Sequence, residues 1–264
     1  MSYVYVNLYE ISSNGVGVSW LARSLFIAVL AASFGGAASW AADKYVWPSG
    51  GNSWPYESLA AAATSIKPAV DAAAPGETVW VTNGTYVLSG EIAVSNGIAV
   101  RSATGPSNTL VNGNGSVRCF SLTDPAAVLD GFTISNGYNA ASGGGVSVQG
   151  GGWVQNCLIV KNSSGSSGGG AYLTSGTITN CVISGNTLGA YRSGAGVYMT
   201  GGTVVNCALT GNTTGGGDLG HGGGAIRCDG ASGMILNCTV VSNSAGASGM
   251  GGGVWVYQGL MRNC

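Results

Sequence analysis

Cysteine is the residue type whose chemistry and spacing stand out first in this chain. Of the seven cysteines, five follow an asparagine, in Asn156-Cys157, Asn180-Cys181, Asn206-Cys207, Asn237-Cys238 and Asn263-Cys264. Thiols can form disulfides or bind metals, but a metal site needs several ligands that converge on one point, and no CxxC pair is present. Equivalent positions in a repeat instead stack in parallel, with side chains aimed at the core rather than at one another. We therefore expect a ladder of buried, unpaired thiols, and neither a metal nor another cofactor.

Carboxylates and histidine, which would supply acid–base chemistry, are few and scattered. Beyond Gly131 the acids are Asp218 and Asp229, and the single histidine, His221, lies in a glycine-rich stretch that we expect to be a solvated loop. Cleavage of a polysaccharide needs carboxylates that act as a pair, or cation-binding acids beside a base. No nucleophile elbow, phosphate loop or zinc motif occurs either. We predict no catalytic residue in this segment, and keep a polysaccharide lyase or glycoside hydrolase as the alternative.

Aromatic and arginine side chains form the pattern that best fits a binding surface. A short apolar alternation recurs along the chain, and its middle positions are Ser147, Tyr172, Tyr198, Arg227 and Trp255. Because successive residues of a strand point to opposite faces, these side chains would stand outward in one column, about 5 Å apart. Such residues are frequent in recognition surfaces, although stacked rings also simply stabilise neighbouring strands. We predict Tyr172, Tyr198, Arg227 and Trp255 as binding residues for a polysaccharide or a surface protein.

A repeat of about 26 residues supplies the elements that would position these side chains. The Asn-Cys pairs are separated by 24, 26, 31 and 26 residues, and each unit contains three short strands. The Asn between the second and third strands suits a left-handed bend, and Asp130 fills the same position one unit earlier. A second asparagine recurs five residues beyond each of the first four cysteines, at Asn162, Asn186, Asn212 and Asn243. The period is too short for a propeller blade of about 40 residues, so we predict a parallel β-helix.

Several segments resemble the right-handed parallel β-helix proteins of the pectate-lyase-like superfamily. They are Lys44–Gly50, Ser65–Ala74, Gly76–Tyr86, Ile92–Arg101 and Asp130–Gly137. The repeats, a small-residue triplet followed by a Cys-x-Ile/Val/Leu-x-x-Asn motif, are similar to those of polymorphic outer-membrane protein passengers. The resemblance implies an all-β, right-handed coil whose first turn is capped by a short helix over Ser65–Ala73, with Ser65 as N-cap. It implies no particular activity, because the superfamily contains lyases, hydrolases and adhesins.

The first 41 residues have the features of an export signal. Arg23 precedes an apolar run from Ser24 to Gly36, and the small residues Ser39 and Ala41 precede a cleavage point before Ala42. The strongly apolar part, about 13 residues, is shorter than the roughly 20 of a membrane anchor, which is the alternative. We predict a signal peptide at 1–41 and one β-helix domain at 42–264, without a membrane span after cleavage. We also expect the domain to be truncated, since its last unit lacks a third strand.

Composition and charge agree with an exported repeat protein. The chain has 48 glycines without a Gly-X-Y period, 7% charged residues, and 9 basic against 10 acidic residues. These values argue against collagen, disorder, coiled coils and nucleic-acid binding. We predict a secreted or cell-surface structural or adhesion protein; in the enzyme alternative, the catalytic residues are unrecognised or lie beyond Cys264. Ice binding is a third possibility, but it would need a flat threonine ladder. Thr177 and Thr203 align, whereas Gly152 and Met234 are nearby in the other coils.

Overall fold

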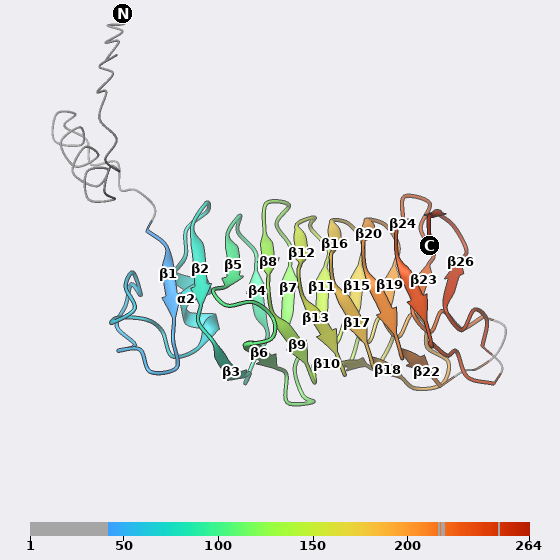
Figure 1. Cartoon of the computed structure of the whole chain (residues 1–264), viewed down its shortest axis with the longest axis horizontal. Coiled ribbons are helices and arrows are strands. Elements are labelled where there is room, and N and C mark those ends of the chain that lie inside the picture. Colours follow the sequence, from blue (N-terminus) through green and yellow to red (C-terminus); the bar gives the residue numbers. More distant parts are fainter. Residues whose placement is uncertain (1–41, 216, 218–219, 248) are drawn as a thin grey trace, which may run out of the picture. The chain divides into compact units, whose positions relative to one another are not determined.

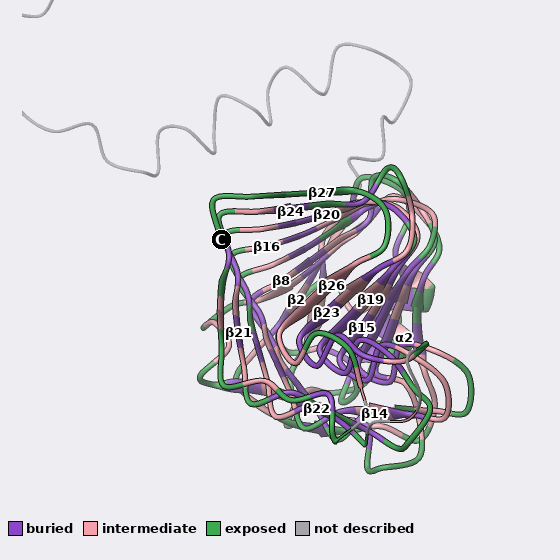
Figure 2. Cartoon of the chain, turned by 90° about the vertical axis from the view of Figure 1, so that its right-hand side faces the viewer, coloured by how far each residue is buried: buried purple, intermediate pink, exposed green. Residues whose placement is uncertain are grey.

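A computed structural model describes residues 42–264 except 216, 218, 219 and 248; the predicted signal peptide at 1–41 lies outside this part. The described residues wind into a parallel β-helix, as predicted (Figure 1). Figure 2 looks along the coil from its C-terminal end, where the chain passes anticlockwise while it approaches the viewer. This is the right-handed sense, so the predicted handedness is confirmed as well.

Four parallel sheets line the coil, and we number them in the order in which one turn visits them. Sheet 1 contains β4 (Ile92–Val94), β7 (Phe120–Leu122), β11 (Val146–Val148), β15 (Ala171–Leu173), β19 (Val197–Met199), β23 (Ile226–Cys228) and β26 (Val254–Val256). Sheet 2 contains β1 (Lys44–Val46), β2 (Thr78–Val81), β5 (Ala99–Ser102), β8 (Val128–Asp130), β12 (Trp153–Gln155), β16 (Thr177–Thr179), β20 (Thr203–Val205), β24 (Met234–Leu236) and β27 (Leu260–Arg262). Sheet 3 contains β3 (Gly84–Val87), β6 (Thr109–Asn112), β9 (Thr133–Ser135), β13 (Leu158–Val160), β17 (Val182–Ser184), β21 (Ala208–Thr210) and β25 (Thr239–Val241).

Sheet 4 is an addition to the three predicted strands of each unit. Its members are two residues long: β10 (Tyr138–Asn139), β14 (Ser163–Ser164), β18 (Thr187–Leu188) and β22 (Thr213–Thr214). Strands this short carry no periodic apolar pattern, because two residues cannot show an alternation. On the outer face of sheet 2, the neighbour of Thr177 is Trp153 rather than Gly152. Gly152 still lies nearby, since its carbonyl accepts the Thr177 N–H, and Thr177 and Thr203 pair as expected without extending into a threonine ladder.

Like residues stack on like residues inside the coil. In sheet 2, Val154, Ile178, Val204 and Ile235 pair in register, and all four are fully buried. The helix α2 (Ile66–Ala72) packs against β1 and β4, and its Ile66, Ala69 and Val70 belong to the same core. Ser65 has the extended backbone of an N-cap, but its side chain makes no capping hydrogen bond. The helix is therefore confirmed, whereas its role as a cap stays a prediction.

Left-handed residues turn the chain between sheets 2 and 3. Asn156, Asn180, Asn206 and Asn237 have φ values of 54°, 52°, 54° and 51°, which confirms the predicted bend. One unit earlier the prediction is wrong: Asp130 is the last residue of β8 and pairs with Gln155. Gly131, with φ of 83°, makes the bend there, because glycine has no Cβ to oppose positive φ. Asp130 still accepts a hydrogen bond from Asn156 Nδ2 at 2.7 Å.

The second asparagine of each unit forms a buried ladder. Asn162, Asn186 and Asn212 are fully buried. The Asn186 amide donates to the Ile159 carbonyl and to Asn212 Oδ1, both at 2.9 Å, while its Oδ1 accepts the Asn162 backbone N–H at 2.9 Å. The carboxamide of Asn186 is thus bonded to backbone groups and to the equivalent side chain of the neighbouring coil, which is the condition for a stable buried polar group.

The cysteines behave as predicted. All seven are unpaired; Cys157, Cys181, Cys207 and Cys238 are 1–4% exposed, and Cys264 is exposed. Each buried ladder thiol donates to the carbonyl two residues earlier, as Cys181 does to Thr179 at 3.1 Å. The neighbouring thiols of Cys157 and Cys207, together with burial, raise the pKa of Cys181. Burial also raises the pKa of Cys119, which lies elsewhere in the core, to about 12.

Candidate binding face on sheet 1

The four residues predicted to bind occupy one column on the outside of sheet 1. Tyr172, Tyr198, Arg227 and Trp255 are the middle residues of β15, β19, β23 and β26 and pair directly in register. Residues on either side of these positions face the core; Val197 and Met199, for example, are fully buried. The middle side chain of each strand must therefore point outward. The predicted alignment is confirmed, while the binding role stays a prediction.

Contacts along this column pair the side chains two by two. The rings of Tyr172 and Tyr198 are stacked, with centroids 5.9 Å apart and planes 12° apart. The Arg227 guanidinium lies 3.9 Å from the centroid of the Trp255 ring, in a cation–π contact. Both separations are close to the strand spacing of about 4.8 Å, so they follow from the register. One face of each ring is consequently covered by its neighbour within the column.

Asp229 joins the two pairs, although it was not among the residues predicted for the face. Its Oδ2 accepts the Tyr198 hydroxyl at 2.7 Å, and its Oδ1 accepts Arg227 Nε at 2.7 Å. Arg227 Nη1 also donates to the carbonyl of Gly220 and to Ser193 Oγ. The side chains of Arg227 and Asp229 are only 14% and 21% exposed, and their opposite charges leave the pair close to neutral overall. An acid two residues after an outward Arg was the available sequence signal.

Tyr198 is held in its neutral form by this environment. Burial, the hydrogen bond to Asp229 and the negative charge of that carboxylate raise the pKa of Tyr198 to about 12, against the opposing charge of Arg227. At neutral pH the phenol therefore keeps its proton, donates a hydrogen bond to Asp229 and cannot serve as a base. The arrangement positions a ring and a carboxylate side by side.

The face is limited to one part of the column. The equivalent positions in the preceding coils are Ala93, Ser121 and Ser147, which are small. From Tyr172 to Trp255 the column crosses four strands, a length of about 14 Å at the usual strand spacing. Its outward polar groups include the Tyr172 hydroxyl and the Trp255 indole N–H, which have no partner among the described residues. A partner would meet ring edges and these polar atoms more readily than ring faces.

Loops between sheets 4 and 1 border the face. The His221 imidazole meets the Tyr191 ring edge-on, with centroids 5.7 Å apart, and Tyr191 is 62% exposed. The Gly220 carbonyl that binds Arg227 belongs to the same loop as His221. His221 is thus half-buried against a tyrosine rather than simply solvated. Asp218, the other acid of this region, lies outside the described residues.

Carboxylates elsewhere in the described part are engaged in structural contacts. Asp130 binds Arg101, Gln155 and Asn156, while Glu91 binds Arg118. Within residues 42–264, apart from the four gaps, no group of three His, Cys, Asp or Glu side chains is placed to hold a metal ion. The same part of the chain contains no helix that is both long and apolar enough to cross a bilayer.

Comparisons with known proteins add no relative. No protein-family model, curated protein or solved structure shows significant similarity to the chain. The fold and the geometry of the face therefore carry the functional argument alone.

Proposed function

We propose that this chain is a secreted or cell-surface β-helix protein that binds a glycan or a protein through the face formed by Tyr172, Tyr198, Arg227 and Trp255. The observation that carries the proposal is the register of these four side chains on one sheet, with Asp229 fixing the middle two. A face whose rotamers are fixed before binding loses little entropy when a partner docks. Aromatic and arginine residues are also those that contribute most to binding energy.

The proposal includes membership of the pectate-lyase-like superfamily, with repeats of the kind found in outer-membrane passengers. The right-handed parallel coil, the helix α2 and the Asn-Cys repeat support it. Export is supported by the apolar run after Arg23 and by the burial of six of the seven thiols, which shelters them from an oxidising environment. Mass spectrometry of the exported protein should find Ala42 at its N-terminus. Recovery of only intact, cytosolic chain would contradict export.

The pairing of side chains within the column also determines which contacts a bound partner can make. Because Tyr172 covers one face of Tyr198 and Arg227 covers one face of Trp255, flat stacking on a ring is restricted. Contacts at ring edges, with hydrogen bonds from the Tyr172 hydroxyl and the Trp255 indole N–H, remain available. The ion pair between Arg227 and Asp229 adds no net charge, so the face favours neutral or polar partners over strongly charged ones.

The test is a binding screen with matched variants of the full chain. Immobilised glycans and surface-protein fragments identify a ligand, and its affinity is measured for Trp255→Ala and Tyr198→Ala. Each should weaken binding at least about tenfold, or about 1.4 kcal/mol, if the residue is a binding hot spot. The control is Trp153→Ala, which removes a tryptophan that is 47% exposed on β12 of sheet 2.

Two results would overturn the proposal. One is equal loss of affinity in Trp153→Ala and Trp255→Ala, or no loss in any variant, with circular dichroism showing intact folds. That result leaves the column with a purely structural role. The other is release of reducing ends or unsaturated products from pectin, alginate or a similar polymer by the purified protein, which would establish the enzymatic alternative.

A further inference from the structure

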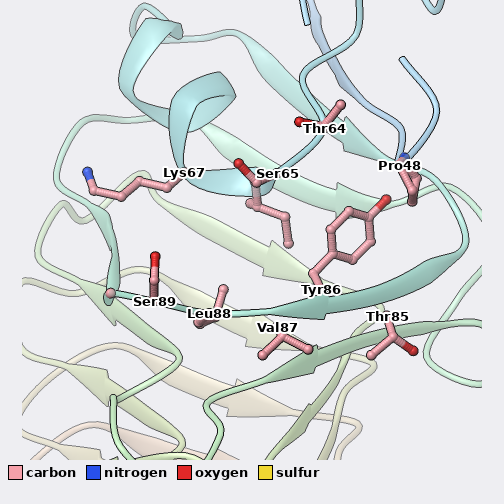
Figure 3. Close-up of a pocket in the computed structure, with 11 residues that line it drawn as sticks. Pro48, Thr64, Ser65, Lys67, Thr85, Tyr86, Val87, Leu88 and Ser89 are labelled. Atoms are coloured by element: carbon pink, nitrogen blue, oxygen red, sulfur yellow. The ribbon is translucent and has the colours of Figure 1, made fainter. Parts of the chain in front are cut away.

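A pocket near the N-terminal end of the coil lies away from the sheet 1 column and has no role in the proposed function. Its volume is about 320 Å³, and it opens between the start of α2 and the segment that runs along β3 to Gly90 (Figure 3). Small-molecule sites span about 300–1,000 Å³, so this pocket has room for one small ring rather than for an extended chain.

The pocket combines an apolar floor with a hydroxyl-bearing rim. Tyr86 and Ile66 are 5% and 1% exposed and line its inner part. Ser65 on the helix side and Ser89 on the opposite side are exposed, and Figure 3 shows them at two sides of the pocket. Neither hydroxyl has a partner among the described residues, and Ser65 does not use its side chain to cap α2. These hydroxyls can therefore bond to a ligand without breaking a contact of the protein.

The charge of the pocket is neutral overall. Its one charged lining residue is Lys67, whose ammonium binds both carboxylate oxygens of Asp71, at 2.9 and 2.7 Å. An anionic ligand would have to compete with this carboxylate for the ammonium. A neutral ligand with one apolar face and several hydroxyl groups matches the lining better.

Gly90 keeps one side of the pocket open without a structural need for glycine. It has no positive φ, and a Cβ built on it would meet no atom within 4 Å. A larger side chain there would fit the backbone and take up space in the pocket. Gly189, in the loop after β18, has the same two properties but does not line the pocket, and so provides a matched control.

We propose that this pocket binds a single neutral sugar ring, with the ring's C–H face toward Tyr86 and Ile66 and its hydroxyls bonded to Ser65 and Ser89. A free monosaccharide and the end ring of a longer glycan present the same chemistry. They differ at the anomeric position, so a free sugar and its methyl glycoside distinguish the two sources.

In the experiment, the isotope-labelled protein is titrated with glucose, galactose, mannose, N-acetylglucosamine, their methyl glycosides and glucuronate. Binding is measured from the change in amide chemical shifts in NMR spectra. At least one probe should shift the amides of Ser65, Thr85 and Ser89 saturably, at the millimolar affinity typical of small rings. Gly90→Phe should weaken this binding at least about tenfold, and Gly189→Phe should leave it within about twofold. The double variant Ser65→Ala/Ser89→Ala should weaken it about fivefold or more.

The double variant changes only exposed hydroxyls, so it keeps the test valid if Gly90→Phe fails to fold. Tighter binding of the methyl glycoside would assign the pocket to a glycan end. Absence of saturable shifts with every probe, or equal affinity of the Gly90→Phe and Gly189→Phe proteins, would overturn the proposal. Tighter binding of glucuronate than of glucose would also overturn it. Shifts confined to Trp255 and its neighbours would assign sugar binding to the sheet 1 face instead.

Discussion

Removing one carboxamide from the buried asparagine ladder tests how the coils are held together. In Asn186→Ala, the Ile159 carbonyl loses its 2.9 Å bond to Nδ2, and the Asn162 backbone N–H loses its 2.9 Å bond to Oδ1. The Asn162 backbone N–H is left buried without a partner, which costs about 1–3 kcal/mol, and the lost bond to the Ile159 carbonyl adds about 0.5–1.5 kcal/mol. We therefore expect a loss of about 2–4 kcal/mol in the free energy of unfolding. That is a large fraction of the stability of a typical domain.

Asn180→Gly is the comparison, because it removes an asparagine from the exposed corner ladder. Asn180 donates one exposed hydrogen bond, to Asn156 Oδ1 at 2.7 Å, and glycine tolerates the φ of 52° at this corner. We expect a cost of about 0.5–1.5 kcal/mol. Both variants lose an asparagine that bonds to the equivalent residue of the neighbouring coil, but only Asn186 is buried and also bonds to backbone groups, so the larger cost is expected for Asn186→Ala.

A third variant, Asn186→Asp, tests how stability changes with pH when a buried carboxylate replaces the carboxamide. Asn186→Asp keeps the acceptor for Asn162 but replaces the donor to Ile159 by a buried carboxylate, whose pKa in the folded state should be raised. When the pKa of an acid is higher in the folded protein than in the unfolded one, the folded state is most stable below the unfolded pKa, which is about 4 for aspartate. This stability is lost as the pH rises toward the folded pKa. The Asn186→Asp protein, in contrast to wild type, should therefore be more stable at about pH 4 than at neutral pH.

Chemical denaturation measures these differences, and hydrogen exchange at the Asn162 amide reports local opening if the coils unfold one by one. Exchange of this amide should accelerate in Asn186→Ala and stay near the wild-type rate in Asn180→Gly. A loss below about 1 kcal/mol for Asn186→Ala, or equal losses for Asn186→Ala and Asn180→Gly, would refute the assignment of the inner ladder as a structural support.

Three further predictions concern the corner, the thiols and the Tyr198 phenol. Asn206→Ala should be less stable than Asn206→Gly, because alanine at the φ of 54° pays about 1–2 kcal/mol that glycine avoids; equal stability of both with wild type would contradict the corner. In a thiol titration Cys264 should react first, and the ladder thiols only after denaturation; recovery of a Cys157–Cys181 linked peptide would contradict the unpaired ladder. Because the pKa of Tyr198 is raised to about 12, the contribution of its neutral phenol to stability should be complete below about pH 10 and lost toward pH 12. Denaturation of wild type and Tyr198→Phe at about pH 10 and about pH 12 measures this loss. If Tyr198→Phe loses as much stability as wild type between these pH values, the loss does not come from Tyr198.

Much of the coil was predictable because its information is local and repeated. The spacing of the Asn-Cys pairs indicates the length of the repeat. The apolar alternation, such as Val197 and Met199 around Tyr198, indicates which side chains face the core. Once equivalent positions stack, the register of the outer column follows without knowledge of any distance. The error at Asp130 has a local cause too: its unit carries Asp-Gly where the others carry Asn, and the glycine takes the bend.

The burial of the inner asparagine ladder could not be predicted from the repeat. Its recurrence was visible at Asn162, Asn186, Asn212 and Asn243, but a polar residue gives no sign of whether it faces solvent or core. The choice depends on the backbone groups that a sharp turn leaves unpaired, and those groups exist only in the folded coil. Three of the two-residue strands of sheet 4 follow directly after these asparagines, and they were missed because two residues are too few to show an alternation.

The sequence by itself determined the parallel β-helix, the unpaired thiols and the outward alignment of Tyr172, Tyr198, Arg227 and Trp255, because each depends on repetition at a fixed period. Only the tertiary structure decided which partners those side chains have. Asp229 reaches both Tyr198 and Arg227, and Gly90 lies across from α2, because the coil brings together residues far apart in the chain. Contacts of this kind depend on the height and rotation of each turn, which a repeating pattern of residue types does not encode.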